Sequence, residues 1–544
     1  MKAILVVDGE NMVYDIIIRN GRIIDGCGNP WYKADIAIKD GKIIKIGKVS
    51  PSEADEVIDA TGLIVCPGFI DMHSHSDFFL LINPKAESKI RQGVTTEVIG
   101  NCGSSLSPIL PDKVEIFKKR SGVLAEEVTW DWSSYKEYTE KLERQGIALN
   151  VAPLIGHGTL RVNIMEFENR PPTKDELDEM KALLEESLKN GAFGLSTGLI
   201  YTPGAYAKTE EIIELAKVAS KYNGIYASHI RSESTWLLEA IEEAIRIGKE
   251  ANIPVEISHM KAAGKKNWGK VKDALRLIEK ARSEGIEITC DFYPYTAGST
   301  GLAACLPPWA HEGGVEEMLK RLQDPAMRNK MREHIEKGLP GWENLAGTAG
   351  WDNIVIAYCE KNKEYEGLSI SQIAEKRGVD PFDATFNLLI EEEGIVWIIL
   401  HMMNEDDMKY VMRHPVSMVG TDGSSYAPYG VLARGKPHPR NYGTFPRILG
   451  RYVREQNVLT LQEAIRKMTS LPAQKLGLKD RGLIREGYWA DIVIFDPKTI
   501  VDRATFKNPH QYPKGIEYVI VNGEITIKKG EHTGKLAGRV LRRL

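Results

Sequence analysis

The chain has 544 residues, which exceeds a single small domain and suits a large enzyme with a second, smaller domain. Its 71 Lys and Arg residues stand against 75 Asp and Glu residues, so the formal net charge is −4. This balance excludes the basic footprint of a nucleic-acid-binding protein and the polybasic patch of a membrane-surface protein. We therefore expect a small-molecule substrate, and the composition leaves the oligomeric state open.

The cysteines and the apolar runs bear on location. Six cysteines lie at irregular spacings, and the start MKAILVVDGENMVYD has too short an apolar run for a signal peptide. No apolar stretch approaches the roughly 18 to 20 residues that a membrane span needs. We expect a cytoplasmic protein with reduced thiols that does not enter a membrane.

Short strands with turn signals occupy the first part of the chain and recur at its other end. Ile-rich runs flank Asn20-Gly21 and Asp40-Gly41, which are dipeptides typical of β-hairpins. The segments GLIREGYWADIVIFD and IEYVIVNGEITI show the same pattern. We predict a small β-sandwich domain formed by residues 1–61 plus 477–544.

Residues 62–476 change to apolar strands that alternate with helices about every 30 residues, the spacing of βαβ units. One helix is clearly bounded, because Thr173 and Glu176 form a capping box and Gly191 is a stop signal. The pattern predicts an α/β fold with a (β/α)8 TIM-type barrel. The expected strands are LIVCPGFIDMHSH, TTEVIGNCG, ALNVAPLIG, AFGLSTGL, GIYASHI, IPVEISHMK, IEITCDFYPY and VSMVGTDG.

The segment of about 296–350 interrupts this alternation with Pro307-Pro308, Trp309 and several glycines. We predict an insertion near the barrel mouth, with a lid as one interpretation. Two further strand-like pieces, NIVIAYC and VWIILHM, leave the order of the barrel strands open, since either could replace one of the eight.

Potential metal ligands recur where the predicted strands end, on the face where barrel enzymes place their active sites. Two histidines are two positions apart on a strand, so their side chains share one face. The others follow four further strands, and the strand-Ser-His ending occurs twice, 30 residues apart. The residues are His73, His75, Cys102, His229, His259 and Asp422.

Each of these residues also fits a purely structural role: surface histidines, an inert buried thiol, satisfied core histidines or an Asp-Gly turn. Their gathering at the strand ends of one barrel favours a site for one or two divalent metals. Mixed nitrogen, sulfur and oxygen donors favour zinc over magnesium or calcium.

At these residues the chain resembles the amidohydrolase superfamily, and within it the D-aminoacylase (N-acyl-D-amino-acid deacylase) family. PGFIDMHSHSD is similar to the superfamily's first-strand motif, and GLIREGYWADIVIFD to its C-terminal strand motif. The narrower set GNCG, GAFGLSTGLIYTPG, SHIRSES, SHMK, DFYPY, GTDG and HPRNYGTFPR resembles the D-aminoacylase motifs in the same order. The resemblance covers nearly the whole chain.

The resemblance implies roles for the candidate residues. Cys102, His229 and His259 would hold a tightly bound zinc, and His73, His75 and Asp422 would line a weaker second position. Asp422 would be the proton shuttle. Lys261, Tyr293 and Arg440 would bind the free carboxylate of the substrate, with Tyr201 as a further contact; a solvated surface charge is the alternative for Lys261 and Arg440.

One position departs from the resemblance. Met260 stands where the family's SHHK-like segment has a second histidine. We expect its side chain to point away from the metal and to change packing, which leaves the preference among substrate side chains open.

The expected activity is zinc-dependent hydrolysis of N-acyl-D-amino acids, which gives a carboxylate and a free D-amino acid. The D stereochemistry rests on the resemblance alone. The nearest alternative is a cyclic amide hydrolase of the dihydroorotase or hydantoinase type, against which Cys102 and the HPR segment argue. A non-catalytic scaffold is a second alternative, but such a protein is expected to lose its metal ligands.

Overall fold

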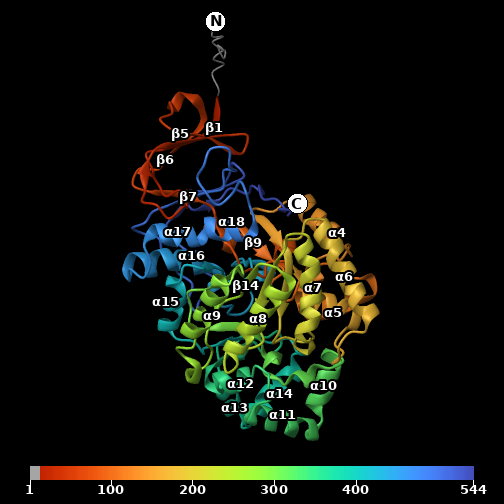
Figure 1. Ribbon diagram of the computed structural model, residues 1–544. Coiled ribbons are helices and arrows are strands. Elements are labelled where there is room, and N and C mark those ends of the chain that lie inside the picture. The colour runs from red at the N-terminus through yellow and green to blue at the C-terminus, as the bar shows by residue number, and fades with distance from the viewer. Residues whose placement is uncertain (1–12, 544) are drawn as a thin grey trace.

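A computed structural model describes residues 13–543. The N-terminal residues on which the expected lack of a signal peptide rests lie mostly outside this range. Figure 1 shows a small β-rich part at the top, an α/β body in the middle and a group of helices at the bottom. Over the described residues, no helix combines the length and the apolar character that crossing a membrane requires.

The α/β body contains the eight expected barrel strands in the expected order, and the third of them, ALNVAPLIG, is divided into β10 and β11. Parallel pairing gives two runs, β10-β9-β8 and β11-β12-β13-β14-β15-β19. The bounds are β8 (Phe69–Asp71), β9 (Val94–Ile99), β10 (Asn150–Pro153), β11 (Ile155–Gly156), β12 (Gly194–Gly198), β13 (Ile225–His229), β14 (Val255–Ile257), β15 (Ile288–Phe292) and β19 (Ser417–Val419).

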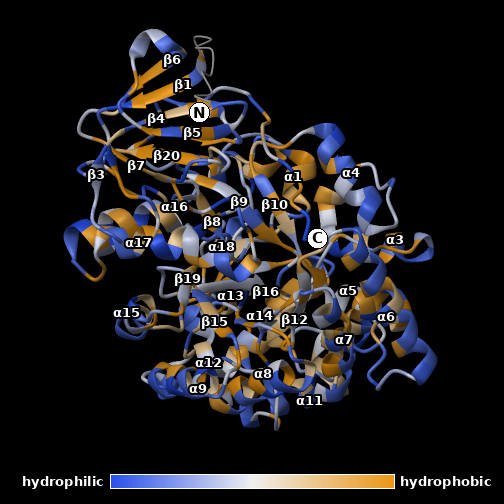
Figure 2. Ribbon diagram, turned by 45° about the horizontal axis from the view of Figure 1, so that its top comes forward, coloured by the Kyte–Doolittle hydropathy of each residue, from blue (hydrophilic) through white to orange (hydrophobic). Residues whose placement is uncertain are grey.

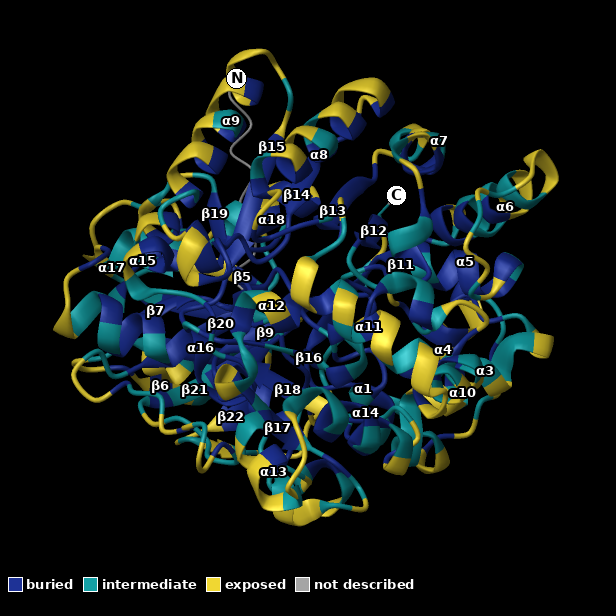
Figure 3. Cartoon of the chain, turned by 90° about the horizontal axis from the view of Figure 1, so that it is seen from below, coloured by how far each residue is buried: buried dark blue, intermediate teal, exposed yellow. Residues whose placement is uncertain are grey.

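Hydrogen bonds join these two runs at both edges. Phe193 N donates to Pro153 O at 2.8 Å, which connects β10 to β12, and Met72 N donates to Val419 O at 3.2 Å, which connects the first strand to the last. The strands are buried on both faces, as in β13, where all five residues are buried. Seen from below in Figure 3, β13, β14 and β15 are dark blue, whereas the outer turns of the helices are yellow.

Amphipathic helices cover the strands. In α8, the buried residues Leu237, Ile241, Ala244 and Ile247 recur at helical spacing, and Glu and Lys fill the opposite face. The capping box of α6 is confirmed, with both of its hydrogen bonds present. The helices are α4 (Tyr135–Gln145), α5 (His157–Met165), α6 (Lys174–Lys189), α7 (Thr209–Lys221), α8 (Leu237–Ala251), α9 (Val271–Ser283), α15 (Glu405–Arg413), α16 (Arg440–Arg447), α17 (Leu461–Met468) and α18 (Ser470–Leu476).

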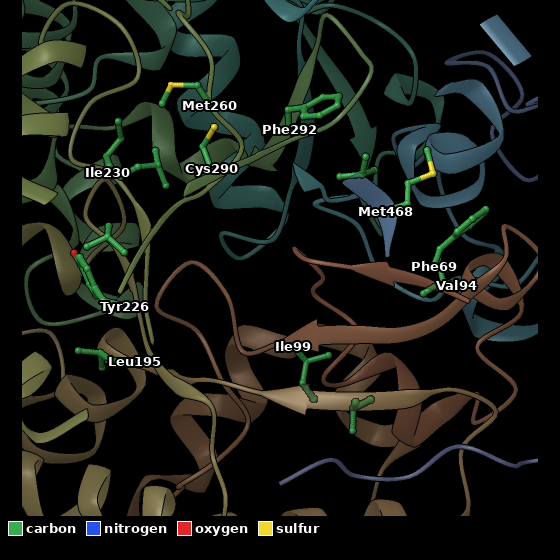
Figure 4. Packing of buried hydrophobic residues seen from close by; sticks show 14 of the residues in the cluster. Phe69, Val94, Ile99, Leu195, Tyr226, Ile230, Met260, Cys290, Phe292 and Met468 are labelled. Atoms are coloured by element: carbon green, nitrogen blue, oxygen red, sulfur yellow. The ribbon is translucent and has the colours of Figure 1, made fainter. Parts of the chain in front are cut away.

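Figure 4 shows how the barrel core is filled. Phe69, Ile99, Leu195 and Phe292 come from different strands and belong to one large buried cluster that the covering helices complete. The core therefore lies between the strand layer and the helix layer.

Two sheets form the small domain, and Ile side chains fill the space between them. One sheet has the order β5-β4-β1-β6 and the other β23-β22-β21-β20-β7-β2-β3, so only the second mixes strands from both ends of the chain. Their strands are largely orange in Figure 2, for example β1, β4 and β20. The bounds are β1 (Tyr14–Arg19), β2 (Arg22–Ile23), β3 (Tyr32–Lys33), β4 (Asp35–Lys39), β5 (Lys42–Gly47), β6 (Ala54–Asp59), β7 (Ile64–Pro67), β20 (Ile492–Phe495), β21 (Ile516–Val521), β22 (Glu524–Lys528) and β23 (Glu531–His532).

Two details of this domain differ from the expected pattern. The Asp40-Gly41 turn joins paired strands as expected, but Asn20-Gly21 carries the chain from one sheet to the other, because β1 and β2 have different partners. The expected first barrel strand also divides at Pro67, since β7 pairs with β2 and β20 in the small domain. The domain limits 1–61 plus 477–544 and 62–476 stay a prediction.

The inserted segment runs between β15 and α15 and continues well beyond residue 350. NIVIAYC and VWIILHM supply β17 (Ile354–Tyr358) and β18 (Trp397–Leu400). β18 pairs antiparallel with β17 on one side and with β16 (Gly298–Gly301) on the other, and neither β17 nor β18 displaces a barrel strand. Its helices are α10 (Val315–Gln323), α11 (Pro325–Lys337), α12 (Leu345–Ala349), α13 (Ile370–Arg377) and α14 (Pro381–Glu391). They share a separate hydrophobic core with the sheet and lie at the bottom of Figure 1, opposite the small domain.

Candidate metal centre and active site

The structure gathers the six predicted ligands at the carboxyl ends of the barrel strands. The two histidines of the first motif follow β8, and Cys102 follows β9. His229 ends β13, His259 follows β14, and Asp422 follows β19. His73, His229 and His259 are buried. Parallel strands thus bring together residues that are far apart in the sequence.

The thiol of Cys102 lies at the centre of the cluster. Its Sγ is 3.6 Å from His229 Nδ1 and 3.5 Å from His259 Nε2. Zinc bonds of about 2.3 Å to sulfur and about 2.05 Å to nitrogen, at a tetrahedral angle, give a separation of about 3.6 Å between the two ligand atoms. Both thiol–imidazole separations therefore match zinc-ligand spacing.

A second set of donors adjoins the first. Asp422 Oδ1 lies 3.0 Å from His75 Nε2 and 3.6 Å from His73 Nε2. His73 Nε2 is also 3.3 Å from the Cys102 sulfur, so the two sets meet at that contact. Ligand atoms of His73, Cys102, His259 and Asp422 all lie within 4.8 Å of one another. These four ligand atoms could hold a metal ion, and they come from both sets.

Three of these residues have a left-handed backbone. The φ angles are 51° at Cys102, 36° at His259 and 50° at Asp422. Such a conformation is costly for residues other than glycine, and proteins retain it mainly at functional sites. Around Cys102 the turn is eased by Gly100 and Gly103, whose φ angles are 76° and 73°. The local sequence thus aims these side chains into the cluster.

The charges of the cluster favour metal binding. Burial raises the pKa of the Cys102 thiol, but the neighbouring imidazoles outweigh burial and hold that pKa well below its usual value. Burial likewise raises the pKa of Asp422, and Arg440 with the histidines lowers it well below the usual range. Both shifts favour the anionic form, in which a thiol or a carboxyl group binds a metal ion.

Two buried carboxylates that the sequence analysis missed orient the imidazoles. Glu233 Oε1 lies 2.7 Å from His259 Nδ1, and Asp291 Oδ2 lies 3.3 Å from His73 Nδ1. Such contacts to the second ring nitrogen fix the orientation of a ligating histidine. Glu233 also lies close enough to His229 and His259 to share an ion with them.

Three of the four predicted substrate contacts line an adjoining cavity. Tyr201, Lys261 and Tyr293 line it, together with His229, His259 and Asp422. The inserted segment supplies part of the opposite wall: Gly298, Ser299, Thr300, Leu345, Leu400 and Met402. The insertion is therefore part of the site.

The two predicted cations are not solvated surface charges. Lys261 and Arg440 are 8% and 5% exposed. Lys261 pairs with Glu233, and Arg440 Nη1 donates to Asp422 Oδ2 at 2.7 Å. Both cations also lie over the ring of Tyr293. Arg440 therefore lies behind Asp422, which lines the cavity, and is joined to it by this hydrogen bond.

Met260 packs away from the metal ligands. It is 5% exposed, belongs to the main hydrophobic cluster, and appears with Phe292 in Figure 4. It also lines a second cavity beside His259, Lys261 and Tyr293. The change from histidine thus falls in packing, as the sequence predicts.

Comparison with known proteins decides the family. The sequence profile of the amidohydrolase family matches residues 56–527. The chain belongs to the amidohydrolase family. A D-aminoacylase of Alcaligenes xylosoxydans xylosoxydans is 36% identical over 98% of this chain and 99% of its own length. An N-acyl-D-aspartate deacylase of the same organism is 35% identical over 97% and 95%. These relatives place the chain in the D-aminoacylase group of the family.

Solved structures also support the assignment of this amidohydrolase to the D-aminoacylase group. The N-acyl-D-glutamate deacylase of Bordetella bronchiseptica, complexed with zinc and a phosphonate mimic of the tetrahedral intermediate, superposes with a TM-score of 0.81 at 34% identity, over 97% of this chain and all of that chain. A D-hydantoinase superposes with a TM-score of 0.54 at 16% identity, over 97% and 99% of the two chains, which shows a common fold.

Proposed function

We propose that this amidohydrolase cleaves the amide bond of N-acyl-D-amino acids and releases a carboxylate and a free D-amino acid. The observation that carries the proposal is the contact of Cys102 Sγ with His229 and His259 at zinc-ligand spacing, beside the carboxylate of Asp422. Relatives that act on N-acyl-D-amino acids, as their names state, support the choice of substrate.

Zinc is the metal that this donor set fits. We assign Cys102, His229 and His259 to the tighter ion, and His73, His75 and Asp422 to a weaker second position. When bound, zinc lowers the pKa of water from about 15.7 towards 7 and polarises the amide carbonyl. A thiolate donates more charge than an imidazole, so Cys102 would hold the ion firmly at some loss of Lewis acidity.

Asp422 is the group placed to move the proton. Its Oδ1 faces His73 and His75, and its Oδ2 is held by Arg440. Asp422 would accept a proton from the attacking water and deliver it to the leaving nitrogen, so that hydroxyl ends on the acyl carbon and hydrogen on the amine. The Arg440 contact would keep the carboxylate oriented between these two transfers.

The cationic side of the cavity suits the free carboxylate of the substrate. Lys261 and Tyr293 line the cavity directly, and Tyr201 closes it near His229. Arg440 lies over Tyr293 and offers a planar fork that matches a carboxylate. We propose that these four side chains bind the amino-acid portion.

All six cysteines are free thiols, which supports a cytoplasmic location as part of the proposal.

A paired hydrolysis assay tests the function. N-acetyl-D- and N-acetyl-L-amino acids are incubated with the protein, with and without added zinc, and the free amine is measured. We expect zinc-dependent hydrolysis of the D series only. Activity on the L series alone would overturn the D-aminoacylase assignment, and activity on cyclic amides alone would favour a hydantoinase-like enzyme. A protein that binds no metal and ignores a chelator would favour a scaffold.

A further inference from the structure

Lys89 lies on the short helix α2 (Glu87–Ile90), outside both ligand sets, and its side chain is fully buried. Its ammonium donates to Asp71 Oδ2 at 2.6 Å, to Thr421 Oγ1 at 2.6 Å, to Gly423 O at 2.9 Å and to Ser74 Oγ at 3.1 Å. Glu97 Oε2 is 3.4 Å away. Two carboxylates thus compensate the buried charge, and oxygens surround its protons.

The partners of Lys89 lie beside metal ligands on two different strands. Ser74 separates His73 from His75. Thr421 and Gly423 stand on either side of Asp422, and Gly423 also forms a parallel bridge with Ser74. One cation therefore joins the segment that carries the two histidines to the segment that carries the carboxylate.

The same contacts hold a strained backbone. Asp422 has a φ of 50°, and both of its neighbours bind the Lys89 ammonium. Asp71 reinforces the link, because its Oδ1 accepts from Thr421 N at 2.8 Å and from His73 N at 3.2 Å. An unfavourable φ persists where surrounding contacts over-determine it, and here Lys89 and Asp71 supply those contacts.

We propose that Lys89 is a positioning residue that fixes His73, His75 and Asp422 relative to one another. The proposal rests on the proposed function, because it assigns these three residues to the second metal position and Asp422 to proton transfer. The bonds that Lys89 donates go to none of Cys102, His229 and His259 or to the residues next to them. Its loss should therefore act on one ligand set and spare the other.

The test compares Lys89→Met with Lys467→Met. Lys467 is also a buried lysine, and it binds Ser417 O at the start of β19, away from the site. Metal content is measured by titration with zinc, and the thiolate-to-metal absorption of the cobalt-loaded protein reports on Cys102. Turnover is measured on an N-acetyl-D-amino acid.

We expect Lys89→Met to keep the first metal ion and the cobalt–thiolate absorption, while affinity for the second ion and kcat fall by about 10- to 100-fold. Lys467→Met should change neither the affinity for the second ion nor kcat. The proposal is overturned if Lys89→Met weakens both ions equally, or if it matches Lys467→Met in kcat and in second-metal affinity. A wild-type protein inactive on every N-acyl-D-amino acid would refute the proposed function, yet the metal titrations would still test Lys89.

Lys89→Met leaves Asp71 and Glu97 buried without their cation and could fail to fold. Thr421→Val keeps the shape of that side chain and strands no charge, and it removes the hydroxyl's bond to the ammonium together with its bonds to Asp71 Oδ2 and Gly423 N. We expect a smaller loss of kcat and of second-metal affinity, again with the cobalt–thiolate absorption unchanged. Full retention of both quantities in a folded Thr421→Val protein would contradict the proposal.

Discussion

At the scale of single residues, the site combines a thiol and a carboxyl group with imidazoles, three of which are buried. Asp422 forms charged contacts with both histidines of the second set and with Arg440. Its low pKa follows from those partners, which outweigh the effect of burial. The low pKa keeps Asp422 in the carboxylate form, which is the form that a metal ligand or a proton acceptor requires.

Replacing Asp422 by Asn should separate metal binding from proton transfer. The amide keeps the shape and one acceptor oxygen but cannot accept a proton. We expect the tightly bound zinc to be retained and kcat to fall by about 10²- to 10⁴-fold, the contribution typical of a positioned acid or base. Zinc analysis and steady-state kinetics on the same preparation check this. Substantial turnover in the metal-loaded variant would refute the assigned role.

Glu233 is a second residue-scale test, because it contacts His259 and Lys261 at once. Glu233→Gln removes the negative charge that orients His259 and pairs with Lys261. We expect affinity for the first zinc to fall by about 10- to 100-fold and KM to rise. Glu243→Gln is the matched control, since Glu243 pairs with Arg231 outside the ligand sets. Equal effects of the two substitutions on zinc affinity would contradict the role.

At the scale of elements, the alternation of strands and helices could be predicted because the barrel strands contain short apolar runs and most of the covering helices, such as α8, are amphipathic. The ends of the strands could also be identified, since His73, Cys102, His229, His259 and Asp422 interrupt apolar runs. Those signals depend only on local sequence. They were enough to predict which side chains the structure brings together.

The parts that were missed depend on contacts between distant segments. Charged residues usually lie at the surface, and only the tertiary structure shows that Glu233, Asp291 and Lys89 are buried. The motifs SHIRSES and DFYPY contain two of them, but spacing alone gives no partner. β17 and β18 posed the same difficulty, because an apolar strand pairs as readily in a separate antiparallel sheet as in the barrel.

The capping box of α6 gives a prediction at the element scale. Thr173 Oγ1 accepts from Glu176 N at 3.3 Å, and Glu176 Oε2 accepts from Thr173 N at 2.7 Å. Thr173→Ala should lower the free energy of unfolding by about 1 kcal/mol and leave kcat unchanged. Urea denaturation measures the first quantity. Lys174→Ala, which removes no capping bond, should have little effect; an equal loss there would argue against the cap.

At the scale of the whole molecule, the two ends of the barrel carry different kinds of side chain. The carboxyl ends of the strands carry the ligands, and the inserted segment walls the adjoining cavity. The other end holds buried lysines that bind backbone carbonyls: Lys467 binds Ser417 O, and Lys475 binds Val255 O. Figure 1 shows α17 and α18 on the side of the body that faces the small domain. Burial of cations at this junction links stability to pH.

The pKa of Lys467 determines whether its contribution to stability rises or falls with pH. Burial lowers its pKa from 10.5 to about 8, although Glu463 partly opposes the shift. The unfolded chain therefore binds more protons than the folded protein between about pH 8 and 10.5, so this residue's contribution to stability rises with pH across that range. Below about pH 8 the buried ammonium carries its full desolvation cost.

We expect the difference in unfolding free energy between wild type and Lys467→Met to shift by about 3 kcal/mol in favour of wild type from pH 8 to pH 10.5. Chemical denaturation at several pH values measures the difference, and subtracting the variant cancels the titration of other groups. Lys141→Met is the control, since that lysine pairs with Asp131 at the surface. A pH-independent difference for Lys467→Met would show that the ammonium stays charged throughout, because the carbonyls around it would then compensate its burial in full.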